Sequence, residues 1–197
     1  MKNRAAATAA ITLTALLALA GCASTTSSGG TDTMPGMGSS ASASPAADVN
    51  MADMQFTMMM IPHHEQAVEM ADMILAKDGI DERVLTLAEQ IKAAQGPEIE
   101  LMESWLDEWG TPMGDMDGMD HGGMMSDTDM QALEDATGAE ASRLFLEQMI
   151  VHHEGAIEMA QDEVDNGQNP DVITLAENII ASQTTEIATM EDILATL

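Results

Sequence analysis

The chain has 197 residues and a formal net charge of −28 at neutral pH, because 34 acidic residues oppose only six lysines and arginines. This charge argues against binding to nucleic acid and against electrostatic attraction to anionic lipid, and it favours cations as partners. Solubility or a high-salt habitat would explain it equally well. The chain also contains 20 methionines, two tryptophans, two phenylalanines and no tyrosine. A methionine-rich core is therefore expected, since methionine fills irregular gaps.

The first 47 residues divide into a targeting segment and a linker. Basic residues precede an apolar run over 5–20, which is typical of a secretory signal peptide and too short for a comfortable membrane span. The run ends in Leu-Ala-Gly-Cys22, which resembles the bacterial lipobox and implies lipidation of Cys22, the only cysteine of the chain. We expect a lipoprotein signal peptide over 1–21, with an ordinary cleaved signal as the alternative. Residues 22–47 are rich in small and polar residues and are expected to be a flexible tether.

Residues 48–197 are expected to form one folded domain, and hydrophobic periodicity predicts that it is all-α. Gly79 and Gly110 are predicted to end the first two helices, and Pro170 is a good first residue for the last one. Thr137 and Glu140 have the spacing of a capping box. The predicted helices are 48–77, 81–109, a short one at 129–135, 137–167, and 170 to the C-terminus. Pro62 falls inside the first helix and should kink it or mark its true start.

A 12-residue motif occurs twice. Met60-Ile-Pro-His63-His64-Glu-Gln-Ala-Val-Glu-Met70-Ala returns as Met149-Ile-Val-His152-His153-Glu-Gly-Ala-Ile-Glu-Met159-Ala. The copies differ at Pro62/Val151 and Gln66/Gly155. The local packing of the two copies is therefore expected to differ, whereas both keep the polar His-His-Glu pattern. Residues 86–91 also match residues 174–179. The repeat therefore predicts two helical hairpins that form a four-helix bundle.

The paired histidines are expected to point into this bundle. At about 100° per residue, both histidines of a pair share the apolar face of their helix with the flanking methionines. Imidazole and thioether groups are metal ligands. The candidate ligands of the bundle are Met60, His63, His64, Met70, Met149, His152, His153 and Met159.

Two acidic residues, Glu98 and Glu186, fall on the apolar faces of the second and fourth long helices at places that the repeat makes equivalent. An unpaired buried charge is costly, so we expect both carboxylates to be buried within hydrogen-bond reach of the paired histidines. They would orient the imidazoles around a bound metal. Structural His–Glu hydrogen bonds in a polar core layer are the alternative.

The connection between the hairpins, over 110–128, is also rich in methionine. Thioether sulfur selects Cu(I) or Ag(I) over hard cations, and protons do not compete for it. A calcium loop is a rival interpretation, although the acidic residues do not follow the EF-hand spacing; a flexible linker is another. The candidate soft-metal ligands here are Met113, Met116, Met119, His121, Met124 and Met125.

The two histidine motifs and the Glu-Ile-x-x-Met segments at 98–102 and 186–190 are similar to those of the bacterial secreted "domain of unknown function 305" family. The resemblance covers roughly 48–197. It implies a ferritin-like four-helix bundle, and some members of the family are linked to copper binding and resistance. The family often has Phe-Asp before the second motif, where this chain has Ala141-Ser142; Asp53 occupies the matching place in the first half.

These observations favour a lipid-anchored protein outside the cytoplasm that binds copper, as Cu(I), or silver, and buffers or hands on the ion. No catalytic residue, organic cofactor or nucleic-acid partner is expected, and a homo-oligomer is left open. The alternatives are a metal-dependent oxidase and an interaction or chaperone module whose methionines bind apolar partners.

Overall fold

A computed structural model describes residues 48–111 and 122–197, and within these residues it contains five helices and no strand. The all-α prediction is confirmed. The helices are α1 (Met51–Leu75), α2 (Glu82–Trp109), α3 (Asp127–Asp135), α4 (Gly138–Asn166) and α5 (Pro170–Leu194). The signal peptide, Cys22, the tether, and the loop residues Met113, Met116, Met119 and His121 lie outside the described residues.

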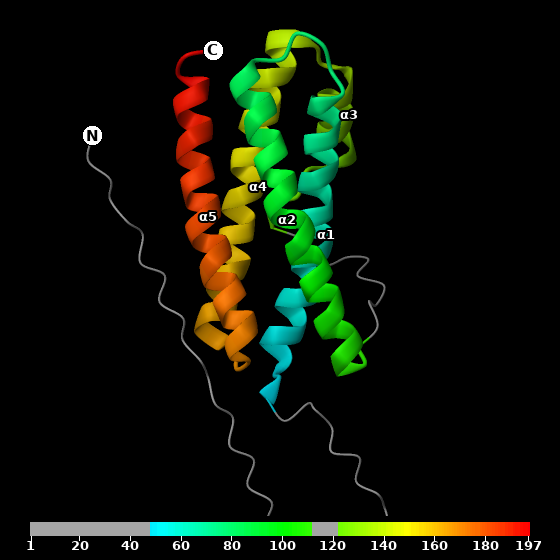
Figure 1. The fold of residues 1–197 in the computed structure, drawn as a ribbon, viewed down its shortest axis with the longest axis vertical. Helices are drawn as coiled ribbons and strands as arrows, with labels where there is room; N and C mark the ends of the chain where they lie inside the picture. Colours follow the sequence, from blue (N-terminus) through cyan, green and yellow to red (C-terminus); the bar gives the residue numbers. More distant parts are fainter. Residues whose placement is uncertain (1–47, 112–121) are drawn as a thin grey trace, which may run out of the picture. The chain divides into compact units, whose positions relative to one another are not determined.

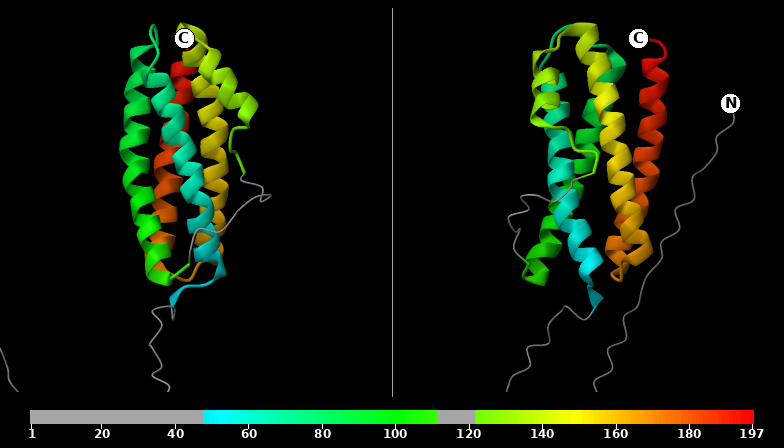
Figure 2. Two further views of the ribbon diagram at one scale, coloured as in Figure 1. Left: turned by 90° about the vertical axis from the view of Figure 1, so that its right-hand side faces the viewer. Right: turned by 180° about the vertical axis from the view of Figure 1, so that it is seen from behind.

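The four long helices run alongside one another, and each repeat forms one helical hairpin (Figure 1). α1 packs on α2, α4 packs on α5, and the two hairpins meet chiefly through α1 and α4. The short helix α3 lies against α1 and α4, as the two views of Figure 2 show. The helices that carry the two histidine motifs are therefore direct neighbours.

Local sequence sets most helix ends as expected. Gly110 adopts φ 64° and closes α2, and Asn169 caps α5 immediately before Pro170. α1 begins at Met51 rather than at residue 48, because the Asn50 side chain accepts hydrogen bonds from the first free backbone N–H groups of the helix. α5 likewise stops at Leu194, before the C-terminus.

One expectation about a helix start was wrong, and one of the two alternatives for Pro62 is excluded. Thr137 precedes α4, but its side chain makes no capping hydrogen bond, so the predicted capping box does not form. Pro62 does not mark the start of the first helix, because α1 continues through it from Met51 to Leu75. The neighbours of Pro62, Ile61 and His63, are fully buried. Tertiary packing on both sides holds the helix together across a residue that lacks an N–H donor.

The apolar core divides into two clusters along the length of the helices. One contains Ala67 and Met70 of α1 with Met149 of α4. The other contains Met60 of α1 with Ala156 of α4. The four paired histidines lie between the two clusters in both helices, so a polar layer crosses the middle of the core. Within the described part of the chain, no helix is long and apolar enough to cross a membrane.

Candidate metal centre

Four imidazoles form the polar layer, and we call them the imidazole layer: His63 and His64 of α1, and His152 and His153 of α4. All four side chains are fully buried. The rings of His63 and His152 meet across the helix interface, with their centroids 3.7 Å apart and their planes inclined by 42°. The centroids of His152 and His153 are 6.4 Å apart. The structure thus brings both histidine pairs into one place.

Each hairpin supplies one carboxylate to the layer. His64 Nε2 lies 2.8 Å from Glu98 Oε2, and His153 Nε2 lies 2.6 Å from Glu186 Oε2. The expected hydrogen bonds are confirmed. Full burial is not, because the two glutamate side chains are 23% and 19% exposed. They extend inward from the outer helices α2 and α5, so part of each side chain still faces solvent.

These hydrogen bonds fix the tautomer of two histidines. A carboxylate accepts, so Nε2 of neutral His64 and His153 carries the proton and Nδ1 carries the lone pair. Neither Nδ1 atom has a hydrogen-bond partner among the described residues. A buried nitrogen with a free lone pair needs a donor or a metal ion, because leaving it unsatisfied costs about 1–3 kcal/mol.

The environment also favours neutral imidazole. Burial lowers the pKa of His152 well below its ordinary value of 6.5, and the neighbouring imidazoles of His63, His153 and His64 lower it further; a backbone contact with His63 acts in the opposite direction. A neutral ring is the form that binds metal, since a coordinating nitrogen must have lost its proton. His152 is therefore ready to act as a ligand over the physiological pH range.

The methionines of the two motifs differ in their distance from the layer. Met60 and Met149 each precede a histidine pair by about one helical turn and are fully buried. Met70 is fully buried about two turns away, beyond the reach of an ion held by His63. Met159 was expected to face the core like Met70, but it is half-buried and lines a surface cavity of about 360 Å³ between α1 and α4.

The described residues contain no group of three or more His, Cys, Asp and Glu side chains placed to hold one ion. A hard cation that needs many oxygen or nitrogen ligands therefore has no preformed site in this part of the protein. Cu(I) and Ag(I) accept small sets of imidazole and thioether ligands. The imidazole layer with Met60 and Met149 is a donor set of that kind.

Sequence reasoning missed a contact beside the layer. Residues Gly122–Met125, which we call the docked segment, lie against α1 and α4. Gln66 Nε2 donates to the Met125 carbonyl oxygen at 2.9 Å, and Gln66 Oε1 accepts from the Met125 N–H at 2.7 Å. A Cβ atom at Gly155 would lie only 2.1 Å from the Gly122 carbonyl oxygen. The signal was visible in the repeat, because Gln66 and Gly155 are equivalent positions that differ.

Asp53, whose equivalent position holds Ser142, serves the turns of the bundle. The Asp53 carboxylate accepts backbone hydrogen bonds from Gln168 at 3.0 Å and Asn169 at 2.8 Å, which fixes the α4–α5 turn. Ser142 Oγ accepts from the Asp81 N–H at 3.1 Å in the α1–α2 turn. The two residues thus play the same part in the two hairpins, away from the imidazoles.

Glu163 is buried next to Asp53 and is a second residue that sequence reasoning missed. Burial raises the pKa of Glu163 to about 8, and the nearby Asp53 carboxylate adds to this. Burial alone would also raise the pKa of Asp53, but the backbone hydrogen bonds from Asn50, Asn169 and Gln168 lower it. Glu163 is therefore mostly protonated at neutral pH, whereas Asp53 is ionised.

With this fold and this layer, the chain can be compared with known proteins. The family model described as "Domain of unknown function (DUF305)" matches residues 53–194. The chain therefore belongs to this family, as the repeated motifs indicated. Among curated proteins, none matches the chain.

Several solved structures are similar. A DUF305 fragment from Deinococcus radiodurans is 34% identical, with a TM-score of 0.70, and the match covers 76% of this chain and 99% of that one. A DUF305 protein from Streptomyces coelicolor, described as a candidate secreted protein, is 35% identical with a TM-score of 0.69, covering 73% and 92%. CopM in its Cu(II)-bound form is 34% identical with a TM-score of 0.64, covering 73% and 95%. CopM is also known in Cu(I)-bound and Ag-bound forms.

Proposed function

We propose that this protein binds copper, as Cu(I), or silver outside the cytoplasm, and that it buffers the ion or hands it on. The observation that carries the proposal is the pair of oriented histidines. In His64 and His153, a carboxylate holds the Nε2 proton, and Nδ1 is left in the buried layer with no partner among the described residues. When one ring nitrogen of a histidine binds a metal, the other ring nitrogen usually donates its hydrogen to a carboxylate or a carbonyl oxygen, which fixes the orientation of the ring.

The ligand chemistry supports a soft ion. The layer offers four fully buried imidazoles, and the fully buried thioethers of Met60 and Met149 lie about one helical turn away, in the core clusters on its two sides. Such donors select Cu(I) over magnesium or calcium. The similarity to CopM, whose structures include copper-bound and silver-bound forms, supports the same class of ion.

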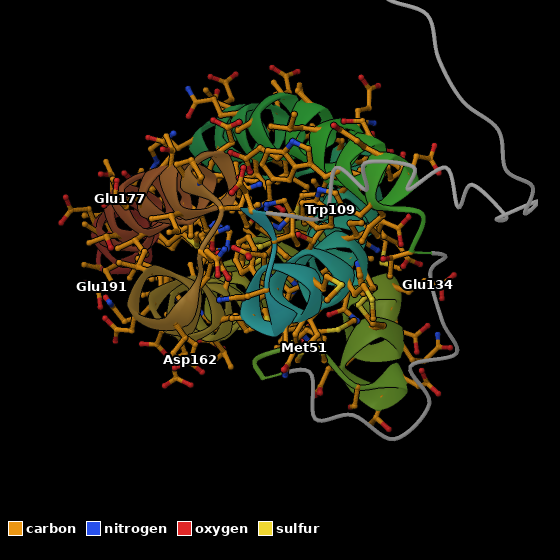
Figure 3. All side chains as sticks on the ribbon, turned by 90° about the horizontal axis from the view of Figure 1, so that it is seen from below. Met51, Trp109, Glu134, Asp162, Glu177 and Glu191 are labelled. Carbon is orange, nitrogen blue, oxygen red and sulfur yellow. The ribbon has the colours of Figure 1, made fainter. Side chains whose placement is uncertain are left out.

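The surface charge supports capture of cations. Carboxylates project outward around the helices, as Glu134, Asp162, Glu177 and Glu191 do in Figure 3. A surface of one sign raises the local concentration of ions of the opposite sign. The negative charge would therefore concentrate copper near the protein without providing the selective site.

Further parts of the proposal concern residues outside those described. Met113, Met116, Met119 and His121, with Met124 and Met125 of the docked segment, would hold additional soft ions. Lipidation at Cys22 would anchor the protein to the bacterial cell membrane, with residues 23–47 as the tether. Binding is proposed rather than catalysis because all four imidazoles are buried, whereas catalytic metal sites keep a coordination position open to substrate.

An anaerobic titration with Cu(I), followed through the ring nitrogen signals of protein carrying ¹⁵N-histidine, tests the proposal. Metal should shift the Nδ1 signals of His64 and His153 and leave their Nε2 signals in the protonated range, because the carboxylates keep those protons. Ring signals that stay unchanged at saturating Cu(I) would contradict a metal site in the layer and leave the His–Glu pairs as structural hydrogen bonds.

A further inference from the structure

The two hairpins repeat in sequence and pack through their equivalent helices α1 and α4, with Ala67 in the cluster of Met149 and Met60 in the cluster of Ala156. We infer from this matching that an approximate twofold axis relates the hairpins, and side-chain contacts locate it. Equivalent residues of two repeats can touch each other only close to such an axis. His63 and His152 are equivalent, and their rings meet at 3.7 Å. The axis therefore passes through the imidazole layer between these two rings.

The docked segment crosses the same axis on the face formed by α1 and α4. Gln66 and Gly155 are equivalent residues, each three positions after the first histidine of its pair. Both contact the segment, Gln66 through two hydrogen bonds to Met125 and Gly155 through backbone contact with Gly122 and Gly123. The segment therefore covers the end of the axis closest to His63 and His152.

Close backbone packing holds this cover in place. Gly123 adopts φ 83°, which favours glycine, and a Cβ atom there would lie 2.9 Å from the carbonyl oxygen of Val151, the residue before His152. A glutamine at position 155 would occupy the space of Gly122. A single segment that crosses a twofold axis contacts two equivalent positions but cannot itself be symmetric. One position therefore needs a small residue where the segment comes close, and the other needs a longer side chain that extends to the segment. Gly155 and Gln66 meet these two requirements.

The opposite end of the axis is built differently. Glu98 and Glu186 are equivalent residues on α2 and α5, and each reaches the layer while remaining partly exposed. Among the described helices, α2 and α5 are not one of the closely packed pairs. This end presents two solvent-accessible carboxylates that lead directly to the imidazoles.

We propose that the docked segment seals the imidazole layer at the α1/α4 face, so that a soft monovalent cation enters and leaves between Glu98 and Glu186. The inference rests on the proposed function, because it assigns the access route of the same site. Gln66 and Gly155 are then positioning residues that act through the segment, and the anionic end is the one that attracts the cation.

The test compares Gly155→Ala and Gln66→Ala with wild type and with Gly96→Ala. The alanine at 155 forces the segment away by steric conflict, and the alanine at 66 removes two hydrogen bonds without adding bulk. Gly96 is also a helical glycine, but a Cβ atom there meets nothing within 4 Å, which makes it the matched control. Without metal, exchange of the Met125 amide proton should accelerate by about tenfold or more in both test variants, since its hydrogen bond to Gln66 is lost.

The protein is then loaded with Ag(I) and mixed with an excess of a soluble thiol that takes up silver, and the histidine ring signals report release. Opening the sealed face adds a second route, so release should be about tenfold faster in Gly155→Ala and Gln66→Ala than in wild type and Gly96→Ala. If Met125 exchange accelerates but the release rate is unchanged, the segment is not a seal. If Met125 exchange is unchanged in both variants, the assigned contacts do not hold the segment, and the inference is wrong. Failure of Ag(I) to shift any ring signal in wild type contradicts the proposed function itself.

Discussion

The two halves of the bundle agree at the imidazole layer and diverge around it. Each half supplies two buried histidines and one glutamate, with His–Glu distances of 2.8 Å and 2.6 Å. Outside the layer, the equivalent residues Gln66 and Gly155 make different contacts with the docked segment. The equivalent residues Asp53 and Ser142 both accept backbone hydrogen bonds at a turn, but from two N–H groups at Asp53 and from one at Ser142. The comparison separates residues that both halves must share from residues that adapt each half to its own neighbours.

The largest expected effect concerns the turn-capping pair. Asp53→Ala removes a buried carboxylate that accepts three backbone hydrogen bonds, so we expect unfolding to become easier by about 3 kcal/mol. Ser142→Ala removes the acceptor of one backbone N–H and should cost about 1 kcal/mol. Urea denaturation of the two variants measures both values. Equal losses of unfolding free energy in the two variants would contradict the prediction that Asp53 stabilises its turn more than Ser142 does.

A second prediction concerns Glu163, the buried acidic residue next to Asp53. Ser142, the residue equivalent to Asp53, has no such acidic neighbour among its hydrogen-bond partners in the described part of the chain. The folded pKa of Glu163, about 8, lies above its ordinary value of 4.5, so the folded state holds a proton that the unfolded state has lost. Stability should therefore fall as pH rises from 4.5 to 8 and then level off. Glu163→Gln keeps the neutral form, so the variant should be more stable than wild type at pH 8, by roughly 2 kcal/mol. Parallel curves of free energy of unfolding against pH for the two proteins would contradict a raised pKa of Glu163 in the folded state.

The smallest expected effect on stability comes from the connection between the halves. Changing Met113, Met116, Met119, Met124 and Met125 together to Leu should leave the helical circular dichroism unchanged and alter stability by less than about 1 kcal/mol, since leucine and methionine have similar volumes. The number of Cu(I) ions bound should nevertheless fall, because leucine has no sulfur. An unchanged Cu(I) stoichiometry would reassign these methionines to a linker.

Sequence periodicity predicted the helices, the two hairpins and the inward histidines, because each of these depends on local spacing along one helix. It also placed Glu98 and Glu186 beside the imidazoles, since the repeat made their positions equivalent. It did not predict which histidines would meet, because the contact between His63 and His152 depends on how two separate helices pack. Gln66 and Gly155 were recognised as differences, but their role depends on a segment almost 60 residues from one of them along the chain.

The position of Met159 shows a related difficulty. Helical geometry places it on the same face as Met70, yet it borders a surface cavity with Glu163. The exposure of a helical residue depends on its angular position around the helix and also on how far the neighbouring helix extends. Here the neighbouring helix α1 begins at Met51, which lines the same cavity as Met159. An angular pattern alone contains no information about that neighbour.

In the proposed function, the imidazole layer that both halves share binds the soft ion, and the parts in which the halves differ do not. This assignment is tested most directly with the double change His64→Gln and His153→Gln, compared with wild type in anaerobic Cu(I) titrations across a range of pH, because these two histidines carry the oriented Nδ1 atoms. Wild type should show an acid-sensitive component of binding, because protons compete for imidazole nitrogen, and an acid-resistant component at thioether ligands. At His152, acid should compete with the metal only below the ordinary imidazole pKa near 6.5, since burial and the neighbouring imidazoles lower the pKa of this residue. The double variant should lose the acid-sensitive component of binding and keep the acid-resistant one. A variant that binds Cu(I) as wild type does, yet unfolds much more easily, would show that the histidines are structural and would contradict the account.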